Sequence, residues 1–341
     1  MRVLLILLLI IPVGLYLFMT KSPGTLKVPV KVPNILAPST PEPYLFQEIT
    51  IPYLMNRQYQ SSLRELTEYQ DNSTYTSYLT SYNSDGFKVN GLLTIPKGEG
   101  PHPAIVFVHG YIAPTTYRTT EKYVDYVNYL ARNGFVVFKI DLRGHGESQG
   151  EPGGSYYSGD YIIDTLNAYS ALQNADFVNP AKVGLWGHSM AGNVLLRAIA
   201  VKKDIPAAVI WAGAGYTYSD LAQYRLMDRS YRPPSTDTER QRRRQLLNDT
   251  YGTFDPGSWF WKLVPATNYL DGVKTAIEIH HAVDDDVVSI EYSRNLMGVL
   301  DKTDIPHELF EYQTGGHNLT GSSFTQAMQR TVEFFKEKLE Q

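Results

Sequence analysis

The sequence lacks cysteine entirely, because none occurs among its 341 residues. This absence excludes a disulfide framework, a thiolate nucleophile, a lipid-modified cysteine and metal sites built on sulfur ligands. An excess of charge is also lacking, since 31 Lys and Arg stand against 35 Asp and Glu, a formal net charge of −4. Such a balance gives no electrostatic footprint for nucleic acid. Internal repeats are missing as well, which excludes a β-propeller with its blades of about 40 to 50 residues.

One concentration of positive charge stands out in this balanced sequence. It consists of four arginines in a mixed-charge helical pattern: Arg240, Arg242, Arg243 and Arg244. We interpret the cluster as the solvent-exposed face of a helix, and a site for an anion is the alternative.

An uncharged, strongly apolar run covers residues 3–19, directly after Met1 and Arg2. Its position and hydrophobicity predict a membrane-targeting segment over residues 1–20. No small-x-small cleavage site follows it, so we expect an uncleaved N-terminal membrane helix, with secretion after cleavage as the alternative. Residues 21–45 are rich in proline and predict an extended tether. The short N-terminal tip predicts that the part of the chain after the tether is extracytoplasmic.

The remainder of the chain has the pattern of an α/β domain. Residues 46–74 predict a helical N-terminal extension, and residues 75–82 and 87–95 alternate around a Ser-Asp-Gly turn as a hairpin does. Beyond residue 96, helical segments separate short β-branched runs at 104–108, 135–140, 182–186, 207–211, 276–281 and 308–312. This alternation predicts a mostly parallel sheet with helices on both faces within residues 75–341.

The segment Gly187-His188-Ser189-Met190-Ala191-Gly192 ends one of these runs and begins a helical pattern. A serine held in a sharp strand-to-helix turn needs small neighbours two residues before and after it, because the backbone bends through a sparsely populated region. Gly187 and Ala191 fill those places, with one methyl group more than the usual Gly-x-Ser-x-Gly form. The segment therefore predicts a nucleophile elbow with Ser189 as the nucleophile.

A serine nucleophile needs a histidine that takes its proton and a carboxylate that orients the histidine. In a parallel sheet such groups are sought just after the strands. Asp285 follows the run at 276–281, and His317 follows the run at 308–312. The sequence thus predicts a triad of Ser189, Asp285 and His317, in a chain order that differs from the chymotrypsin and subtilisin orders.

Two loops carry a resemblance to a known family. Residues 141–148 read Asp-Leu-Arg-Gly-His-Gly-Glu-Ser, similar to Asp-x-Arg-Gly-x-Gly-x-Ser, and residues 281–288 read His-Ala-Val-Asp-Asp-Asp-Val-Val, similar to His-Gly-x-x-Asp-x-x-Val. From about Tyr75 onward the chain resembles the α/β-hydrolase superfamily, most closely the catalytic domain of the prolyl oligopeptidase family of serine peptidases. It departs from that family's pattern at Ala191 and Ala282, where the family has glycine.

This resemblance implies an α/β-hydrolase fold and selects Asp285 among three adjacent aspartates. It assigns the oxyanion hole to the backbone N–H groups of Tyr111 and Met190. Typical members of the family carry a propeller that screens substrates, and the stretch before Tyr75 is too short to form one.

The other polar clusters have simpler interpretations. A metal site is imaginable among five neighbouring residues, but their spacing matches no ligand pattern, so we expect neither a metal nor a cofactor; they are His280, His281, Asp284, Asp285 and Asp286. We interpret His109, His145 and His188 as groups that hold loops in place.

Residues 212–272 predict a small helical cap, rich in aromatic residues and containing Arg225, Arg229 and Arg232. Such walls suit an acyl or peptide substrate bearing a carboxylate, and packing of the cap onto the core explains the aromatic residues equally well. We expect a serine peptidase that acts on short peptides through an acyl-enzyme. A carboxylic-ester hydrolase is the close alternative, and a non-catalytic binding module is a third. The sequence carries no signal for an oligomeric state.

Overall fold

The computed structural model describes residues 43–224 and 238–339. The predicted membrane segment, and the predicted tether as far as residue 42, lie outside the described residues, so both stay predictions. None of the helices within those two described ranges has both the length and the hydrophobicity that a membrane span requires. From Tyr44 onward the described chain belongs to one compact unit.

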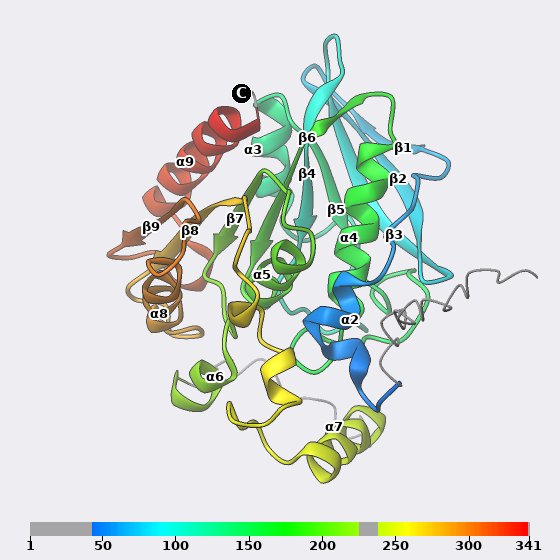
Figure 1. Cartoon of the computed structure of the whole chain (residues 1–341). Coiled ribbons are helices and arrows are strands. Elements are labelled where there is room, and N and C mark those ends of the chain that lie inside the picture. Colours follow the sequence, from blue (N-terminus) through cyan, green and yellow to red (C-terminus); the bar gives the residue numbers. More distant parts are fainter. Residues whose placement is uncertain (1–42, 225–237, 340–341) are drawn as a thin grey trace, which may run out of the picture. The chain divides into compact units, whose positions relative to one another are not determined.

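A nine-stranded mixed sheet forms the centre of this unit (Figure 1). Its strands are β1 Thr67–Asp71, β2 Tyr75–Ser84, β3 Phe87–Pro96, β4 His102–Val108, β5 Val136–Ile140, β6 Val178–His188, β7 Ala207–Trp211, β8 Ala276–Ala282 and β9 His307–Tyr312. They lie in the order β1-β2-β3-β5-β4-β6-β7-β8-β9. The pairs from β5 to β9 are parallel, and β1, β2 and β3 are antiparallel to their neighbours. The predicted, mostly parallel sheet is confirmed.

Helices cover both faces of the sheet, as Figure 1 shows. They are α2 Ile51–Met55, α3 Val124–Arg132, α4 Asp160–Gln173, α5 Ala191–Val201, α6 Tyr218–Tyr224, α7 Thr238–Tyr251, α8 Glu291–Leu300 and α9 Ser322–Leu339. Successive strand side chains point to opposite faces, so β4 sends Val106 into the core with α4 and α5. It sends Ile105 and Phe107 into a second core with α3 and α9.

The hairpin predicted at the start of the domain is confirmed. Strands β2 and β3 pair along their full length around Asp85 and Gly86, whose φ angles of 52° and 84° are those of a tight hairpin turn. The helical extension predicted for residues 46–74 is correct only in its first part, a 3₁₀ turn at Gln47–Ile49 followed by α2. Its last part is β1, because residues 67–71 pair with the exposed edge of β2.

The cap lies beyond the carboxyl ends of the parallel strands, where Figure 1 shows α6 and α7. Its aromatic residues pack with the N-terminal turn in a small core of their own: Phe46, Ile49, Tyr218, Leu247, Phe260, Trp261 and Val264. Packing therefore accounts for the buried aromatic residues of the cap, whereas Trp259 is 59% exposed. Arg225, Arg229 and Arg232 lie outside the described residues.

Candidate active site

Ser189 lies in the tight connection between β6 and α5 that the sequence predicts. Its φ angle is 56°, in the left-handed region that a side chain-bearing residue rarely adopts. A residue held there costs on the order of 1–3 kcal/mol, which the surrounding packing must offset. Ser189 also lines a cavity of about 370 Å³. The turn therefore presents its side chain to a pocket.

The glycine before the turn is required by close packing. A Cβ atom at Gly187 would lie 2.8 Å from the Cβ of Ala191 and 2.9 Å from Leu195. The extra methyl group at position 191 is accommodated because position 187 has none. The departure from the usual motif thus leaves the geometry of the turn intact.

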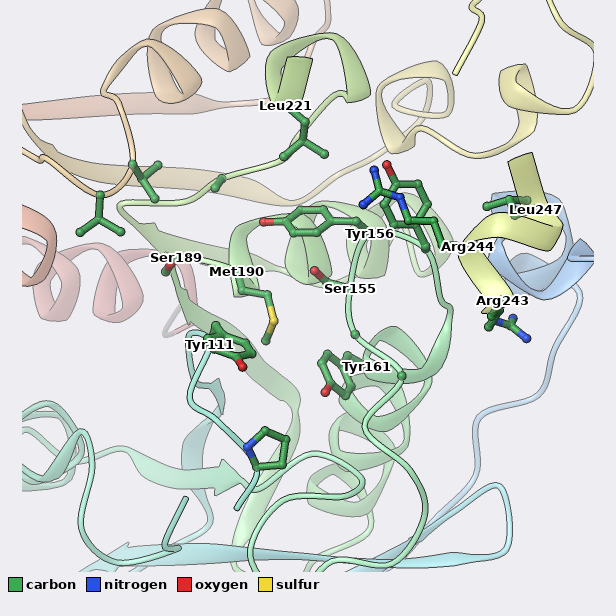
Figure 2. A pocket seen from close by; sticks show the side chains of 17 residues that line it. Tyr111, Ser155, Tyr156, Tyr161, Ser189, Met190, Leu221, Arg243, Arg244 and Leu247 are labelled. Atoms are coloured by element: carbon green, nitrogen blue, oxygen red, sulfur yellow. The ribbon is translucent and has the colours of Figure 1, made fainter. Parts of the chain in front are cut away.

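The loop after β4 passes directly beside the turn. A Cβ atom at Gly110 would lie 3.1 Å from the Cβ of Ser189 and 2.8 Å from the hydroxyl of Tyr123, so a larger residue does not fit there. The next residue, Tyr111, lines the same cavity as Ser189 and Met190 (Figure 2). Met190 stands at the N-terminus of α5, where backbone N–H groups have no partner within the helix. The two residues assigned to the oxyanion hole are therefore neighbours of the serine.

Asp285 and His317 are hydrogen-bonded to each other. Nδ1 of His317 lies 2.8 Å from Oδ2 of Asp285. The other carboxylate oxygen accepts hydrogen bonds of 2.9 Å from the backbone N–H groups of Val287 and Val288. Burial by itself raises the pKa of Asp285, but the hydrogen bonds from His281 and His317 outweigh it and hold this pKa well below its ordinary value. The aspartate is therefore ionised and fixes a proton on Nδ1 of His317.

The three adjacent aspartates have different environments. Asp285 is buried, whereas Asp284 and Asp286 are exposed. Asp284 accepts hydrogen bonds from the backbone N–H groups of Gly315 and Gly316, at 3.3 and 2.8 Å. It therefore holds the loop that carries His317, and Asp286 makes no such contact.

His281 is a second partner of the buried aspartate that the sequence analysis did not assign. Its Nε2 lies 3.2 Å from Oδ2 of Asp285 and 2.9 Å from the carbonyl oxygen of Val288. Both are acceptors, so Nε2 carries a proton, and Nδ1 lies 2.7 Å from the hydroxyl of Ser293. The signal for this role was present in the sequence, as the first position of the acid-loop pattern.

His188 joins three loops around the serine. Its Nε2 lies 2.8 Å from the carbonyl oxygen of His317, and its Nδ1 lies 2.8 Å from the hydroxyl of Tyr123. That hydroxyl accepts a 2.9 Å hydrogen bond from the N–H of Gly110. Burial lowers the pKa of His188 to about 3, so the ring is neutral, accepts from Tyr123 and donates to His317. The interpretation of His188 as a loop-holding group is confirmed.

The other two histidines interpreted in this way also contact backbone. Nδ1 of His109 lies 2.6 Å from the carbonyl oxygen of Gly110, and its Nε2 lies 3.0 Å from that of Asp141. His145 lies 3.2 Å from the carbonyl oxygens of Arg143 and Ile112. Both therefore hold the loops after β4 and β5 together.

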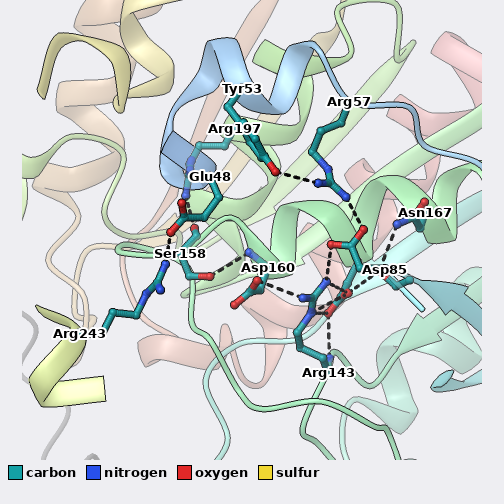
Figure 3. A network of polar contacts seen from close by, with 12 residues as sticks. Glu48, Tyr53, Arg57, Asp85, Arg143, Ser158, Asp160, Asn167, Arg197 and Arg243 are labelled. Carbon is teal, nitrogen blue, oxygen red and sulfur yellow. Dashed lines mark hydrogen bonds and ion pairs between the residues drawn. The ribbon is translucent and has the colours of Figure 1, made fainter. Parts of the chain in front are cut away.

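A buried ion pair supports the loop at 141–148 (Figure 3). The guanidinium of Arg143 makes hydrogen bonds of 2.7 to 3.1 Å to the carboxylate of Asp164 in α4, and Asp160 accepts a further one at 3.0 Å. The Arg143 and Asp164 side chains are 6% and 0% exposed. The arginine of the Asp-x-Arg-Gly pattern is therefore part of the support of this loop.

The metal alternative has no support in the described part of the chain. There, no group of three or more His, Asp or Glu residues is arranged to hold a metal ion. His280 instead contacts Glu278 and Tyr312, at 2.8 and 2.9 Å, within the core.

Residues 99–322 match the family model described as serine aminopeptidase, S33. The chain belongs to this S33 family. The S33 chain is a serine hydrolase with a peptidase-like catalytic domain of the α/β-hydrolase fold, as the sequence analysis expected. Its sequence is 23% identical over 265 residues to the uncharacterized peptidase YtmA of Bacillus subtilis (strain 168). This alignment covers 76% of this chain and 93% of that protein.

Two solved structures show the same fold as the S33 chain. Acetyl xylan esterase 1 from Thermoanaerobacterium sp. JW/SL YS485 aligns with a TM-score of 0.59 and 21% identity, over 85% of this chain and 94% of that one. A puromycin-hydrolyzing peptidase of Mycobacterium tuberculosis also aligns with a TM-score of 0.59, at 20% identity, over 79% of this chain and 40% of that one.

Proposed function

We propose that Ser189, His317 and Asp285 form a catalytic triad that cleaves acyl bonds through an acyl-enzyme. The observation that carries this proposal is the hydrogen bond between Nδ1 of His317 and the ionised Asp285. His188, the residue before Ser189 in its strained turn, contacts the backbone of His317 at 2.8 Å. Because Nδ1 carries the proton, Nε2 of His317 is the nitrogen that takes the proton of the Ser189 hydroxyl.

The reaction then has two stages, acylation of Ser189 and hydrolysis of the acyl-enzyme. The Ser189 oxygen bonds to the substrate carbonyl carbon, and the N–H groups of Met190 and Tyr111 stabilise the resulting oxyanion. The intermediate expels its amine or alcohol, which takes the proton from His317 and leaves the acyl group on the serine. Water, deprotonated by His317, attacks this acyl group, and the serine recovers its proton as the carboxylic acid leaves.

We propose short peptides as the substrates. The family description and the name of the B. subtilis relative both support a peptidase.

A carboxylic-ester hydrolase is the second candidate, favoured by a specific observation. The acetyl xylan esterase aligns over 94% of its own length, whereas only 40% of the puromycin-hydrolyzing peptidase is aligned. The alignment with this chain therefore spans nearly the whole acetyl xylan esterase.

A fluorophosphonate probe tests the proposed nucleophile. Covalent labelling of the folded protein is expected, and Ser189→Ala should abolish it. Ser219→Ala is the matched control, because Ser219 is exposed on α6 and lies away from the pocket lining. Labelling that persists in Ser189→Ala contradicts the assignment, and folded wild-type protein that is never labelled supports the binding module.

A panel of peptide anilides and short-chain aryl esters separates the two candidates. Turnover of the anilides supports the peptidase. Turnover of esters alone contradicts it and supports the ester hydrolase.

A further inference from the structure

The pocket that contains Ser189 extends to the cap helix α7, as Figure 2 shows. Most of its lining is apolar or aromatic, with Tyr111, Tyr156, Tyr157, Tyr161, Met190 and Leu247 among the lining residues. The charged residues among the described lining are Arg243 and Arg244, and no aspartate or glutamate accompanies them. The far end of an apolar pocket therefore carries positive charge.

The charge of Arg243 is compensated within the protein. Its guanidinium is hydrogen-bonded to the carboxylate of Glu48 (Figure 3) and lies 5.1 Å from the ring centroid of Phe46. These contacts join α7 to the N-terminal turn. Arg243 therefore already has a carboxylate partner within the protein and does not need one from a substrate.

Arg244 has a different environment. Its guanidinium carbon lies 4.9 Å from the ring centroid of Tyr157, another residue of the pocket wall. The contacts of Arg244 recorded among the described residues include no ion pair with a carboxylate. A cation–π contact with a ring leaves guanidinium N–H donors available for an anion. Those donors match the two oxygens of a carboxylate.

We propose that this pocket selects substrates in which an apolar or aromatic segment joins the scissile acyl bond to a carboxylate bound by Arg244. The inference rests on the proposed function for the position of the scissile bond at Ser189. A short peptide with a free C-terminus and a half-ester of a dicarboxylic acid both have this chemistry. A free amino group would need a carboxylate partner, and the described lining supplies none. Arg244 is exposed, as the interpretation of the arginine cluster expects, and the proposal takes up the alternative of an anion site for this one arginine.

Two ester pairs of matched length test the selection in the full-length protein. One pair is nitrophenyl hydrogen adipate and nitrophenyl hexanoate, with the charge on the acyl side. The other pair is hexanoyloxybenzoate and methyl hexanoyloxybenzoate. In this pair the leaving group carries the charge, or its neutral methyl ester. We expect kcat/KM to favour the charged member of at least one pair by about tenfold, as for a charge-assisted hydrogen bond.

Variants of α7 assign this preference to a residue. Arg244→Gln should abolish it, and Arg244→Lys should retain part of it, because lysine keeps the charge but not the planar fork. Arg242→Gln is the matched control, since it removes the same charge from an exposed neighbour on the same helix that does not line the pocket. Added salt should weaken the preference, because Arg244 is exposed.

The inference is overturned if kcat/KM for the neutral ester equals or exceeds that for the charged ester in both pairs. It is also overturned if Arg244→Gln shows the same preference as the wild type. If Ser189→Ala retains wild-type turnover, the proposed nucleophile fails instead.

A binding measurement tests the pocket independently of catalysis. Calorimetry on Ser189→Ala compares adipic acid monoanilide with hexananilide, which lacks the carboxylate. Tighter binding of the monoanilide that is lost in Ser189→Ala/Arg244→Gln supports the inference. Equal binding of the two anilides, together with no preference in the pair that carries the charge on the leaving group, overturns it.

Discussion

Nε2 of His188 lies 2.8 Å from the carbonyl oxygen of His317. This contact joins the residue before the proposed nucleophile to the backbone of the proposed base, 129 positions further along the chain. The ring centroids of the two histidines are 4.6 Å apart. A rigid, buried ring at the end of β6 therefore sets the position of the loop that carries His317.

Removing the hydroxyl of Tyr123 should weaken this arrangement. Tyr123→Phe deprives His188 of its donor and the N–H of Gly110 of its acceptor. We expect kcat to fall by about tenfold, the value of one or two hydrogen bonds, with a much smaller change in KM. Steady-state kinetics on the best ester of the panel measure both constants. Tyr129→Phe, in the helix α3 that begins directly after Tyr123, is the control. Equal losses in the two variants contradict a role for the Tyr123 hydroxyl.

Neutral His188 should make stability depend on pH. Its folded pKa of about 3 lies below the ordinary 6.5, so unfolding takes up a proton between these values. The contribution of the neutral ring to the free energy of unfolding is complete above pH 6.5. Between pH 6.5 and pH 3 it falls by about 1.4 kcal/mol for each pH unit. Urea unfolding over a pH series measures how steeply the free energy of unfolding changes with pH. In this window, unfolding of His188→Gln should take up about one proton fewer than unfolding of the wild type. Identical slopes in the two proteins would falsify the assignment of a buried neutral ring.

The three adjacent aspartates should have separable effects. Asp285→Asn should lower kcat on the order of 10³ to 10⁴-fold, because the base loses the carboxylate that orients it. Asp284→Ala should cost about tenfold, because the Gly315 and Gly316 N–H groups lose an acceptor. Asp286→Ala, at an exposed position, should leave kcat unchanged. A larger loss in Asp284→Ala than in Asp285→Asn would reverse the assignment that the acid-loop pattern gives.

The buried pair of Arg143 and Asp164 should be sensitive to the loss of one partner. Arg143→Met leaves a carboxylate with no exposed surface and without its cation, and burial raises the pKa of that carboxyl. We expect the free energy of unfolding to fall by about 3–5 kcal/mol. Urea unfolding measures this loss, and Arg143→Met/Asp164→Leu should recover much of it. A double variant as unstable as the single one would show that the loss comes from packing rather than from the unpaired charge.

Much of the fold follows from local patterns. The Ser-Asp-Gly turn predicts the β2-β3 hairpin because residues with φ above zero fit a tight hairpin turn, and β-branched runs separated by helical patterns predict parallel strands. The strand β1 was not predicted, because its five residues are all exposed and lack an alternating apolar pattern. Its formation depends on the edge of β2, which lies outside that segment.

The proposed site has the same division. Ser189, Asp285 and His317 are predictable because each follows a strand, and the sheet brings the ends of its strands to one edge. The Tyr123 hydroxyl carries no local signal, since its partners come from two other loops. Arg242 and Arg244 lie two positions apart in the same run of arginines, and only Arg244 of these two lines the pocket. The sequence pattern does not distinguish them.

The sequence by itself determined the alternation of strands and helices within residues 75–341, the strained turn at Ser189 and the residue types of the proposed triad, because these depend on neighbours within a few positions. Only the tertiary structure decided which of three aspartates is buried, which groups His188 and His281 contact and which arginines line the pocket. Those outcomes depend on distances between segments far apart in the chain, and local periodicity does not encode such distances.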